Sequence, residues 1–187
     1  MKLLAIDPSA TRCGIAWWTM GEPERLIHHR SFASHGNTAE EKCASFGEQL
    51  GAILDEIGPG YVCFEAAQRY IAGYKKKGVP DLAGATGGWW TPNSDQMILP
   101  ELQGHARQAC MDRKVPFESV AVKTWRAALY GKGGGSLSRD AAKAAAKNYC
   151  RLVGIDPRND DEAEACCILL WCSRCSQMLK FQLMGLA

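Results

Sequence analysis

Two acidic residues stand directly after short apolar runs, where they could act together. Asp7 follows the run at residues 2–6, and Glu65 follows the run at residues 61–64. If both runs are strands that lie parallel and adjacent, the two carboxylates emerge at the same carboxyl edge of a sheet, where open α/β folds place their ligand sites. Taken singly, each acid also fits a solvated turn, because Asp before Pro commonly starts one.

A third acidic group opens the last strongly apolar segment of the chain. Within residues 159–164, Asp161 and Glu164 are three positions apart, so they share one face of a helix. Acids in a first helical turn also complement the helix dipole, and Asn159 with Glu162 predicts a capping box, which accounts for the cluster without chemistry. Yet Asp161 and Glu164 precede apolar residues on the same side, and acids at the edge of a buried face need a partner.

Asp7, Glu65 and the acidic group within residues 159–164 together offer only oxygen ligands. No His has a suitable spacing and no pair of thiolates stands beside these acids in the sequence. This donor set favours Mg²⁺ or Mn²⁺ over Zn²⁺. Carboxylates around two such ions, about 3.5–4 Å apart, can activate a water and stabilise the leaving oxygen in phosphodiester hydrolysis without a nucleophilic Ser or a His. The residues therefore predict a hard-cation site with two ions.

The elements that position these acids are predicted to form one α/β domain over residues 1–187. Apolar runs at 2–6 and 14–20 are typical of a β-hairpin, and further strands are expected at 25–32, 61–64 and 116–122. Helices are expected from Thr38 to the Gly58 stop, and over 95–113, 124–130, 139–152 and 159–179. Helix-connected strands in one sheet are expected to be parallel, so we predict a mixed central sheet opened by an antiparallel hairpin, with helices on both faces.

Residues 69–93 show no sustained periodicity and are rich in Gly and Pro, which predicts a long functional loop. Aromatic and basic side chains interleave there, as they do on surfaces that stack nucleic-acid bases. The DNA-contact candidates in this loop are Arg69, Tyr70, Lys75, Lys76 and Lys77. Trp89 and Trp90 fit either base stacking or anchoring of the loop to the core, and an ordinary exposed loop is the competing interpretation for the whole segment.

Basic residues are concentrated in one part of the chain, although the net charge is only +2. Residues 113–151 hold nine Lys or Arg and two acids. Arg139, Lys143 and Lys147 fall at four-residue steps, with Asp140 as the one acid at helical spacing, which predicts a helix face that tracks phosphates. Lys123 and Lys132 are nearby candidates for DNA contact. A solvated helix face is the alternative interpretation of the stripe.

The composition is that of a folded domain and excludes disordered and collagen-like chains. Hydrophobic residues make up 47% and charged residues 22% of the 187 residues. The longest apolar run, 165–172, is far shorter than the ~20 residues that cross a bilayer, so no membrane association is expected. Nine cysteines, an odd number, fit buried thiols in a reducing cytoplasm, and the lone pair Cys172 and Cys175 fits a structural role better than a zinc or redox site.

Three ordered segments resemble the acidic motifs of a known family. Residues 3–16 (LLAIDPSATRCGIA), 62–65 (VCFE) and 161–165 (DEAEA) are similar to the successive motifs of RuvC-type Holliday junction resolvases, particularly their phage-type relatives, in the ribonuclease H-like superfamily. The resemblance covers nearly the whole chain. It implies a ribonuclease H-like fold and a homodimer that holds a four-way DNA junction and cuts two strands symmetrically. A phage-encoded protein acting in the bacterial cytoplasm is consistent with it.

The resemblance also implies roles for individual residues. Asp7, Glu65, Asp161 and Glu164 match the four metal-binding acids of the family. The family usually has Asp or His at the last of these positions, and Asp160 could serve in place of Asp161. Tyr70 is the nearest match to an aromatic residue that the family inserts near the junction crossover.

The leading hypothesis from the sequence is a metal-dependent, structure-selective DNA endonuclease that acts on four-way junctions. A ribonuclease H-like nuclease that acts on other branched or hybrid nucleic acids is the alternative within enzymes. A module that binds branched DNA without cutting is the alternative of a different class, and it would be expected if the acids did not converge.

Overall fold

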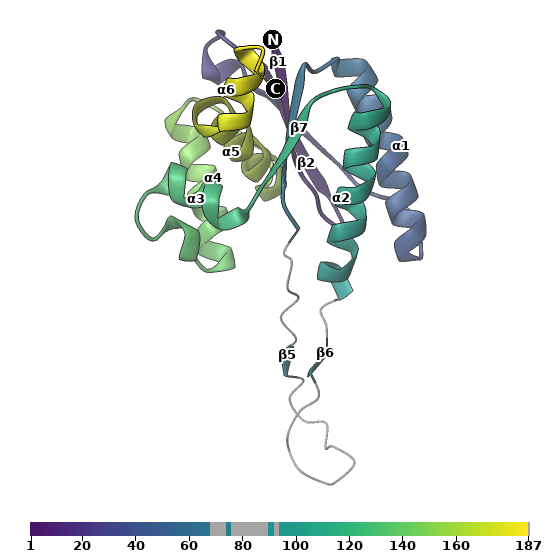
Figure 1. Cartoon of the computed structure of the whole chain (residues 1–187). Helices are drawn as coiled ribbons and strands as arrows, with labels where there is room; N and C mark the ends of the chain where they lie inside the picture. Colours follow the sequence, from purple (N-terminus) through teal and green to yellow (C-terminus); the bar gives the residue numbers. More distant parts are fainter. Residues whose placement is uncertain (68–73, 76–89, 92–93, 187) are drawn as a thin grey trace.

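A five-stranded mixed sheet forms the centre of the computed structural model, in the order β3-β2-β1-β4-β7 (Figure 1). The strand β1 (Lys2–Asp7) pairs antiparallel with β2 (Cys13–Thr19), and β2 pairs antiparallel with β3 (His28–Phe32). On the other side, β4 (Tyr61–Glu65) runs parallel to β1, and β7 (Phe117–Val120) runs parallel to β4. The expected mixed sheet opened by an antiparallel hairpin is therefore confirmed. The third strand begins later than expected, because a 3-10 turn precedes it.

The structure describes residues 1–67, 74–75, 90–91 and 94–186. Most of the loop expected over 69–93 lies outside these residues, including the candidates Arg69, Tyr70, Lys76, Lys77 and Trp89. The described parts are two short strands, β5 (Tyr74–Lys75) and β6 (Trp90–Thr91), which pair antiparallel. The sequence did not predict these two strands, because residues 69–93 show no sustained periodicity.

Helices α1 (Ala39–Ile57) and α2 (Ser94–Asp112) cover one face of the sheet (Figure 1). A capping box at Thr38 begins α1: the Thr38 hydroxyl accepts a hydrogen bond from the backbone N–H of Glu41, and the Glu41 carboxylate accepts one from the backbone N–H of Thr38. Open space lies beside Gly104 of α2, so this glycine does not mark a close approach to a neighbouring element. Ala106 is buried, and it is Gly47 of α1 that admits the His105 ring.

The opposite face is covered by α3 (Val122–Tyr130), α4 (Arg139–Leu152) and α5 (Asp160–Cys175), followed by α6 (Gln177–Leu183) (Figure 1). Helices thus lie on both faces, as expected. The expectation of a single helix over 159–179 is wrong, because the chain leaves helical geometry at Ser176. The Ser176 hydroxyl accepts a hydrogen bond from the backbone N–H of Leu179, which caps α6 and makes the break a defined corner.

Helix α5 is buried over most of its length against the sheet. Its apolar residues, with those of β1 and β4, form a core in which most of the cysteines behave as small hydrophobic side chains. All nine cysteines are free thiols, and eight of them are buried, as the sequence predicted. Within the described residues, no helix combines the length and apolarity needed to cross a bilayer.

Candidate active site

The ends of β1 and β4 bring Asp7 and Glu65 to one edge of the sheet. Ile6 and Phe64 are paired in the parallel ladder, so the acids that follow them stand next to one another in register. Because side chains alternate along a strand, both acids project on the face covered by α5. The convergence expected from the two apolar runs is therefore present.

Gly14 brings the third acidic group to the same place. It is the partner of Asp7 across the hairpin, and a Cβ atom at Gly14 would overlap the backbone carbonyl of Asp161. The absence of a side chain lets the first turn of α5 rest directly on β2. The carboxylates of Asp161 and Glu164 consequently meet those that end β1 and β4.

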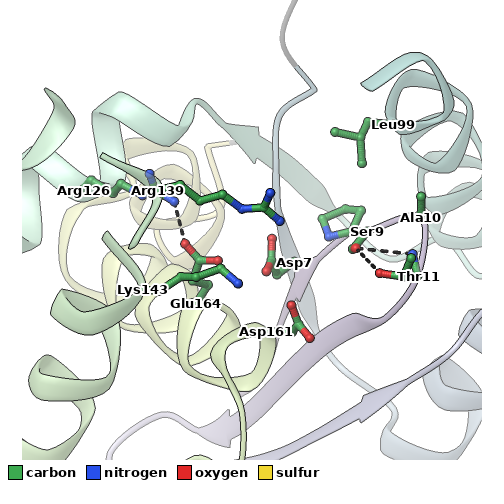
Figure 2. Close-up of a pocket in the computed structure, with 11 residues that line it drawn as sticks. Asp7, Ser9, Ala10, Thr11, Leu99, Arg126, Arg139, Lys143, Asp161 and Glu164 are labelled. Atoms are coloured by element: carbon green, nitrogen blue, oxygen red, sulfur yellow. Dashed lines mark hydrogen bonds and ion pairs between the residues drawn. The ribbon is translucent and has the colours of Figure 1, made fainter. Parts of the chain in front are cut away.

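Three of the four acids line a cavity of about 330 Å³. Figure 2 shows the carboxylates of Asp7, Asp161 and Glu164 directed toward it, with the basic groups of Arg139 and Lys143 close by. The remaining lining residues are Pro8, Ser9, Ala10, Thr11, Leu99 and Arg126. Glu65 lines an adjoining depression that shares Pro8 and Leu99 with the cavity.

Burial raises the pKa of every acid of this group, and repulsion between its members adds to the rise at Asp7, Glu65 and Glu164. The pKa of Asp7 is raised well above its ordinary value, first by burial and then by the charges of Glu65, Glu164 and Asp161. Burial raises the pKa of Glu65 to about 7, with Glu164 adding to the effect and Trp125 and Arg126 opposing it. Burial also raises the pKa values of Asp161 and Glu164. Such a cluster is stabilised by a cation that neutralises it.

The structure distinguishes Asp160 from Asp161 as candidate metal ligands, a choice that the sequence left open. Asp161 lines the cavity with Asp7 and Glu164. Asp160 instead pairs with Lys143 at 3.0 Å and with Lys147 at 2.6 Å, and hydrogen bonds from these lysines lower its pKa. Its carboxylate is therefore engaged by α4, and Asp161 is the better placed of the two as a metal ligand.

Glu162 of the same helical turn points the other way, into the sheet. Its carboxylate lies 2.7 Å from Nδ1 of His29 and accepts hydrogen bonds from Ser31 and from the backbone of Arg158. Although burial acts to raise it, these hydrogen bonds lower the pKa of Glu162 below its ordinary value. The expected capping box is half present: Oδ1 of Asn159 accepts from the backbone N–H of Glu162, but the Glu162 carboxylate accepts from the side-chain amide of Asn159.

The basic helix predicted to track phosphates reaches the cavity at its N-terminal end. Arg139 and Lys143 line the cavity, whereas Lys147 lies one turn further along and pairs with Asp160. Asp140 is the one acid at helical spacing along this stripe, and α5 supplies a further acidic partner, Asp160, from outside the helix. Lys123 and Lys132 are exposed on α3 and on the loop that follows it.

Two side chains of α3 join the site without a sequence signal. The indole Nε1–H of Trp125 donates to Oε2 of Glu65 at 3.0 Å, and Nη2 of Arg126 donates to Oε1 of Glu164 at 2.5 Å. Nothing in the spacing of residues 122–130 relates them to acids on β4 and α5, so only the packing of α3 against these elements reveals the contacts.

A second group of metal-capable side chains lies on the same face of the sheet, further from the carboxyl ends of the strands. Single ligand atoms of Cys63, Glu118 and Cys172 lie within 4.8 Å of one another. The Glu118 carboxylate accepts a hydrogen bond from Ser176, and burial raises the pKa of Cys63 well above its ordinary value. A buried thiol with a raised pKa, such as that of Cys63, is a poor ligand, so this group fits a hydrogen-bonded core contact.

Comparison with known proteins supports the fold. No protein-family model matches the chain, and no curated protein sequence matches it. Among solved structures, Thermus thermophilus RuvC is 17% identical, with a TM-score of 0.62 over 100% of this chain and 98% of that one. The same protein in complex with a Holliday junction substrate is 16% identical, with a TM-score of 0.63 and the same coverage. The yeast mitochondrial Holliday junction resolvase Ydc2 is 12% identical, with a TM-score of 0.54 over 97% of this chain and 83% of that one. The ribonuclease H-like fold expected from the sequence is thereby confirmed.

Proposed function

We propose that this protein is a metal-dependent DNA endonuclease that resolves four-way junctions. The observation that carries the proposal is the convergence of four carboxylates, from β1, β4 and α5, beside the basic groups of Arg139 and Lys143. A similar fold in a protein solved with a Holliday junction substrate supports the choice of DNA structure.

The residues present fit a hard divalent cation. Asp7, Glu65, Asp161 and Glu164 offer only oxygen donors, and their pKa values are raised first by burial and, at Asp7, Glu65 and Glu164, also by the charge of a neighbouring acid of the group. We assign these four acids to hold Mg²⁺ or Mn²⁺, with two ions per site. Such ions lower the pKa of bound water and stabilise the leaving oxygen of a phosphodiester.

The chain's own residues supply the remaining functions. Arg139 and Lys143, on the rim of the cavity, would bind the phosphates that flank the scissile bond and orient the strand above the acids. The exposed Lys123 and Lys132 would extend this path along a duplex arm. A homodimer would present two such sites for paired cuts in opposed strands, since two equivalent sites require a two-fold axis.

The test is incubation of the purified protein in Mg²⁺ with a labelled four-way junction, a replication fork and a nicked duplex. Paired, symmetric cuts on the junction are expected. Cutting that favours forks or hybrid duplexes would instead indicate a nuclease for other branched or hybrid nucleic acids. Junction binding without cleavage in Mg²⁺ or Mn²⁺ would indicate a binding module.

A further inference from the structure

Helix α3 connects two acids of the site that come from different elements. Trp125 bonds to Glu65 at the end of β4, and the next residue, Arg126, bonds to Glu164 on α5. The two donors are adjacent in the chain, so the distance between them is set by one step of a helix. The relative position of the two carboxylates therefore depends on α3.

The two donors are themselves held in place. Trp125 is fully buried, and the guanidinium of Arg126 lies over its ring, 5.1 Å from the centroid. The Tyr130 ring packs edge-on against the indole, with centroids 5.7 Å apart. The side chains of Arg126 and Glu164 are only 17% and 12% exposed. Packing on several sides restricts the rotamers of both donors, which is what the positioning of another side chain requires.

Neither donor can bind a cation. An indole N–H and a guanidinium offer hydrogens and no accessible lone pair, so both residues act through the carboxylates they contact. Each of the two bonds engages one oxygen of its carboxylate, Oε2 of Glu65 and Oε1 of Glu164. Groups that orient metal ligands in this way commonly change metal affinity by about 10–100-fold when they are removed.

We infer that Trp125 and Arg126 are positioning residues, which orient Glu65 and Glu164 for a divalent cation. The inference rests on the proposed function only in assigning the cation to these acids. It separates geometry from charge, because each of two substitutions disturbs one of these bonds while it keeps the aromatic or the cationic character of the side chain. Trp125→Phe removes the N–H and keeps an aromatic ring, and Arg126→Lys keeps the positive charge but loses the planar group that stacks on the indole.

The test is the affinity of each variant for Mn²⁺, measured by calorimetry without DNA. Both Trp125→Phe and Arg126→Lys are expected to bind Mn²⁺ about 10–100-fold more weakly than the wild type. The matched controls are Trp18→Phe, since the buried Trp18 indole has no partner among the described residues, and Arg174→Lys, since Arg174 pairs with Glu24 and lies over the Tyr149 ring. Both controls are expected to retain wild-type affinity.

A second measurement covers the case in which Trp125→Phe does not fold. In ¹⁵N-labelled wild-type protein, the indole signal of Trp125 is expected to shift during a Mg²⁺ titration while that of Trp18 stays in place. The Trp125 signal is assigned from Trp125→Phe or, failing that, as the indole signal that Arg126→Lys displaces. Folded variants with unchanged Mn²⁺ affinity, or a Trp125 signal indifferent to Mg²⁺, would overturn the inference.

Junction cleavage is measured separately, so that the two proposals can fail separately. A wild-type protein that binds Mn²⁺ at these acids and loses affinity in both variants, yet cuts no junction, supports the positioning role and overturns the proposed function. A wild-type protein that binds no divalent cation overturns both.

Discussion

Gly14 and Asp161 touch through their backbones, although they lie near opposite ends of the chain. A side-chain carbon on Gly14 would overlap the carbonyl oxygen of Asp161. Gly14 is also the cross-strand partner of Asp7, so one glycine links the acid of β1 to the acids of α5. The site depends on this close approach as much as on the acids themselves.

Replacing Gly14 by Ala is therefore expected to displace the first turn of α5. Overpacking of this kind costs about 1–3 kcal/mol, and here it also moves Asp161 away from Asp7. Thermal unfolding should show the loss of stability, and calorimetry should show weaker Mn²⁺ binding. Gly104→Ala is the matched control for stability, because open space surrounds Gly104 and alanine gains about 1 kcal/mol over glycine within a helix. Equal stability in the two variants would contradict the proposed contact.

Removing single acids is expected to separate cleavage from binding. Asp7→Asn, Glu65→Gln and Asp161→Asn should each lower the cleavage rate by about a thousandfold, or ~4 kcal/mol, because each removes a metal ligand. Binding to a four-way junction in Ca²⁺ should persist, since no phosphate contact is lost. Glu164→Gln is expected to be milder, because the family that the chain resembles varies at this position. Loss of binding with unchanged cleavage of bound junctions would argue against the site.

Neutralising Glu65 is expected to stabilise the metal-free protein at alkaline pH. Its ordinary pKa of 4.5 is raised to about 7, so between these values the folded protein holds a proton that the unfolded chain has released. The free energy of unfolding then falls as pH rises through this window, by on the order of 3 kcal/mol at most. Glu65→Gln removes this dependence.

Thermal unfolding in EDTA at pH 5 and pH 8 is the measurement. At pH 8 the Gln variant should melt about 2–4 °C higher for each kcal/mol gained. Saturating Mg²⁺ should reverse the order, since the ion stabilises the wild type by binding its folded state. A Gln variant that is less stable than the wild type in EDTA at pH 8 would contradict the expectation.

Freeing the lysines held by Asp160 is expected to strengthen DNA binding. Asp160→Asn removes the partner of Lys143 and Lys147, and each additional phosphate contact steepens the log–log salt dependence of binding by ~0.9 on duplex arms. Cleavage by bound protein should change little. Asp140→Asn is the control, because Asp140 is exposed on the same basic helix.

The converse substitution tests the same surface. Replacing Arg139, Lys143 and Lys147 together with Glu should weaken binding to all DNA shapes and flatten the salt dependence. An unchanged slope would mean that this face is solvated and that DNA is bound elsewhere.

The single substitutions of Asp160 and Asp161 also test which of them binds metal. If Asp160→Asn abolished cleavage and Asp161→Asn did not, the assignment of the metal ligand would be reversed.

The proposed homodimer is expected to use the exposed face of α2. Met97 and Met111 lie there, and they are 53% and 61% exposed. Sedimentation equilibrium should find a dimer for the wild type and a monomer for Met111→Glu. The control is Met178→Glu on α6, where Met178 is 51% exposed. A monomeric wild type, also when bound to a junction, would favour a nuclease that makes single cuts.

The sequence by itself determined the elements and the acids at their ends. Apolar periodicity and the caps at Thr38 and Ser138 involve residues close together in the chain, so α1 and α4 could be predicted from local patterns. The parallel pairing of β1 with β4 followed from the rule for helix-connected strands, and it brought Asp7 and Glu65 together. Residue type then indicated the chemistry.

Only the tertiary structure decided which side chain each polar group contacts. His29 with Glu162, Lys147 with Asp160, and Trp125 with Glu65 are pairs between distant segments. Their contacts depend on the angle at which a helix packs and on the rotamers that packing leaves available. The four acids at the start of α5 look alike in the sequence, yet one faces α4, one faces the sheet and two face the cavity, because a helix turns its successive residues toward different neighbours.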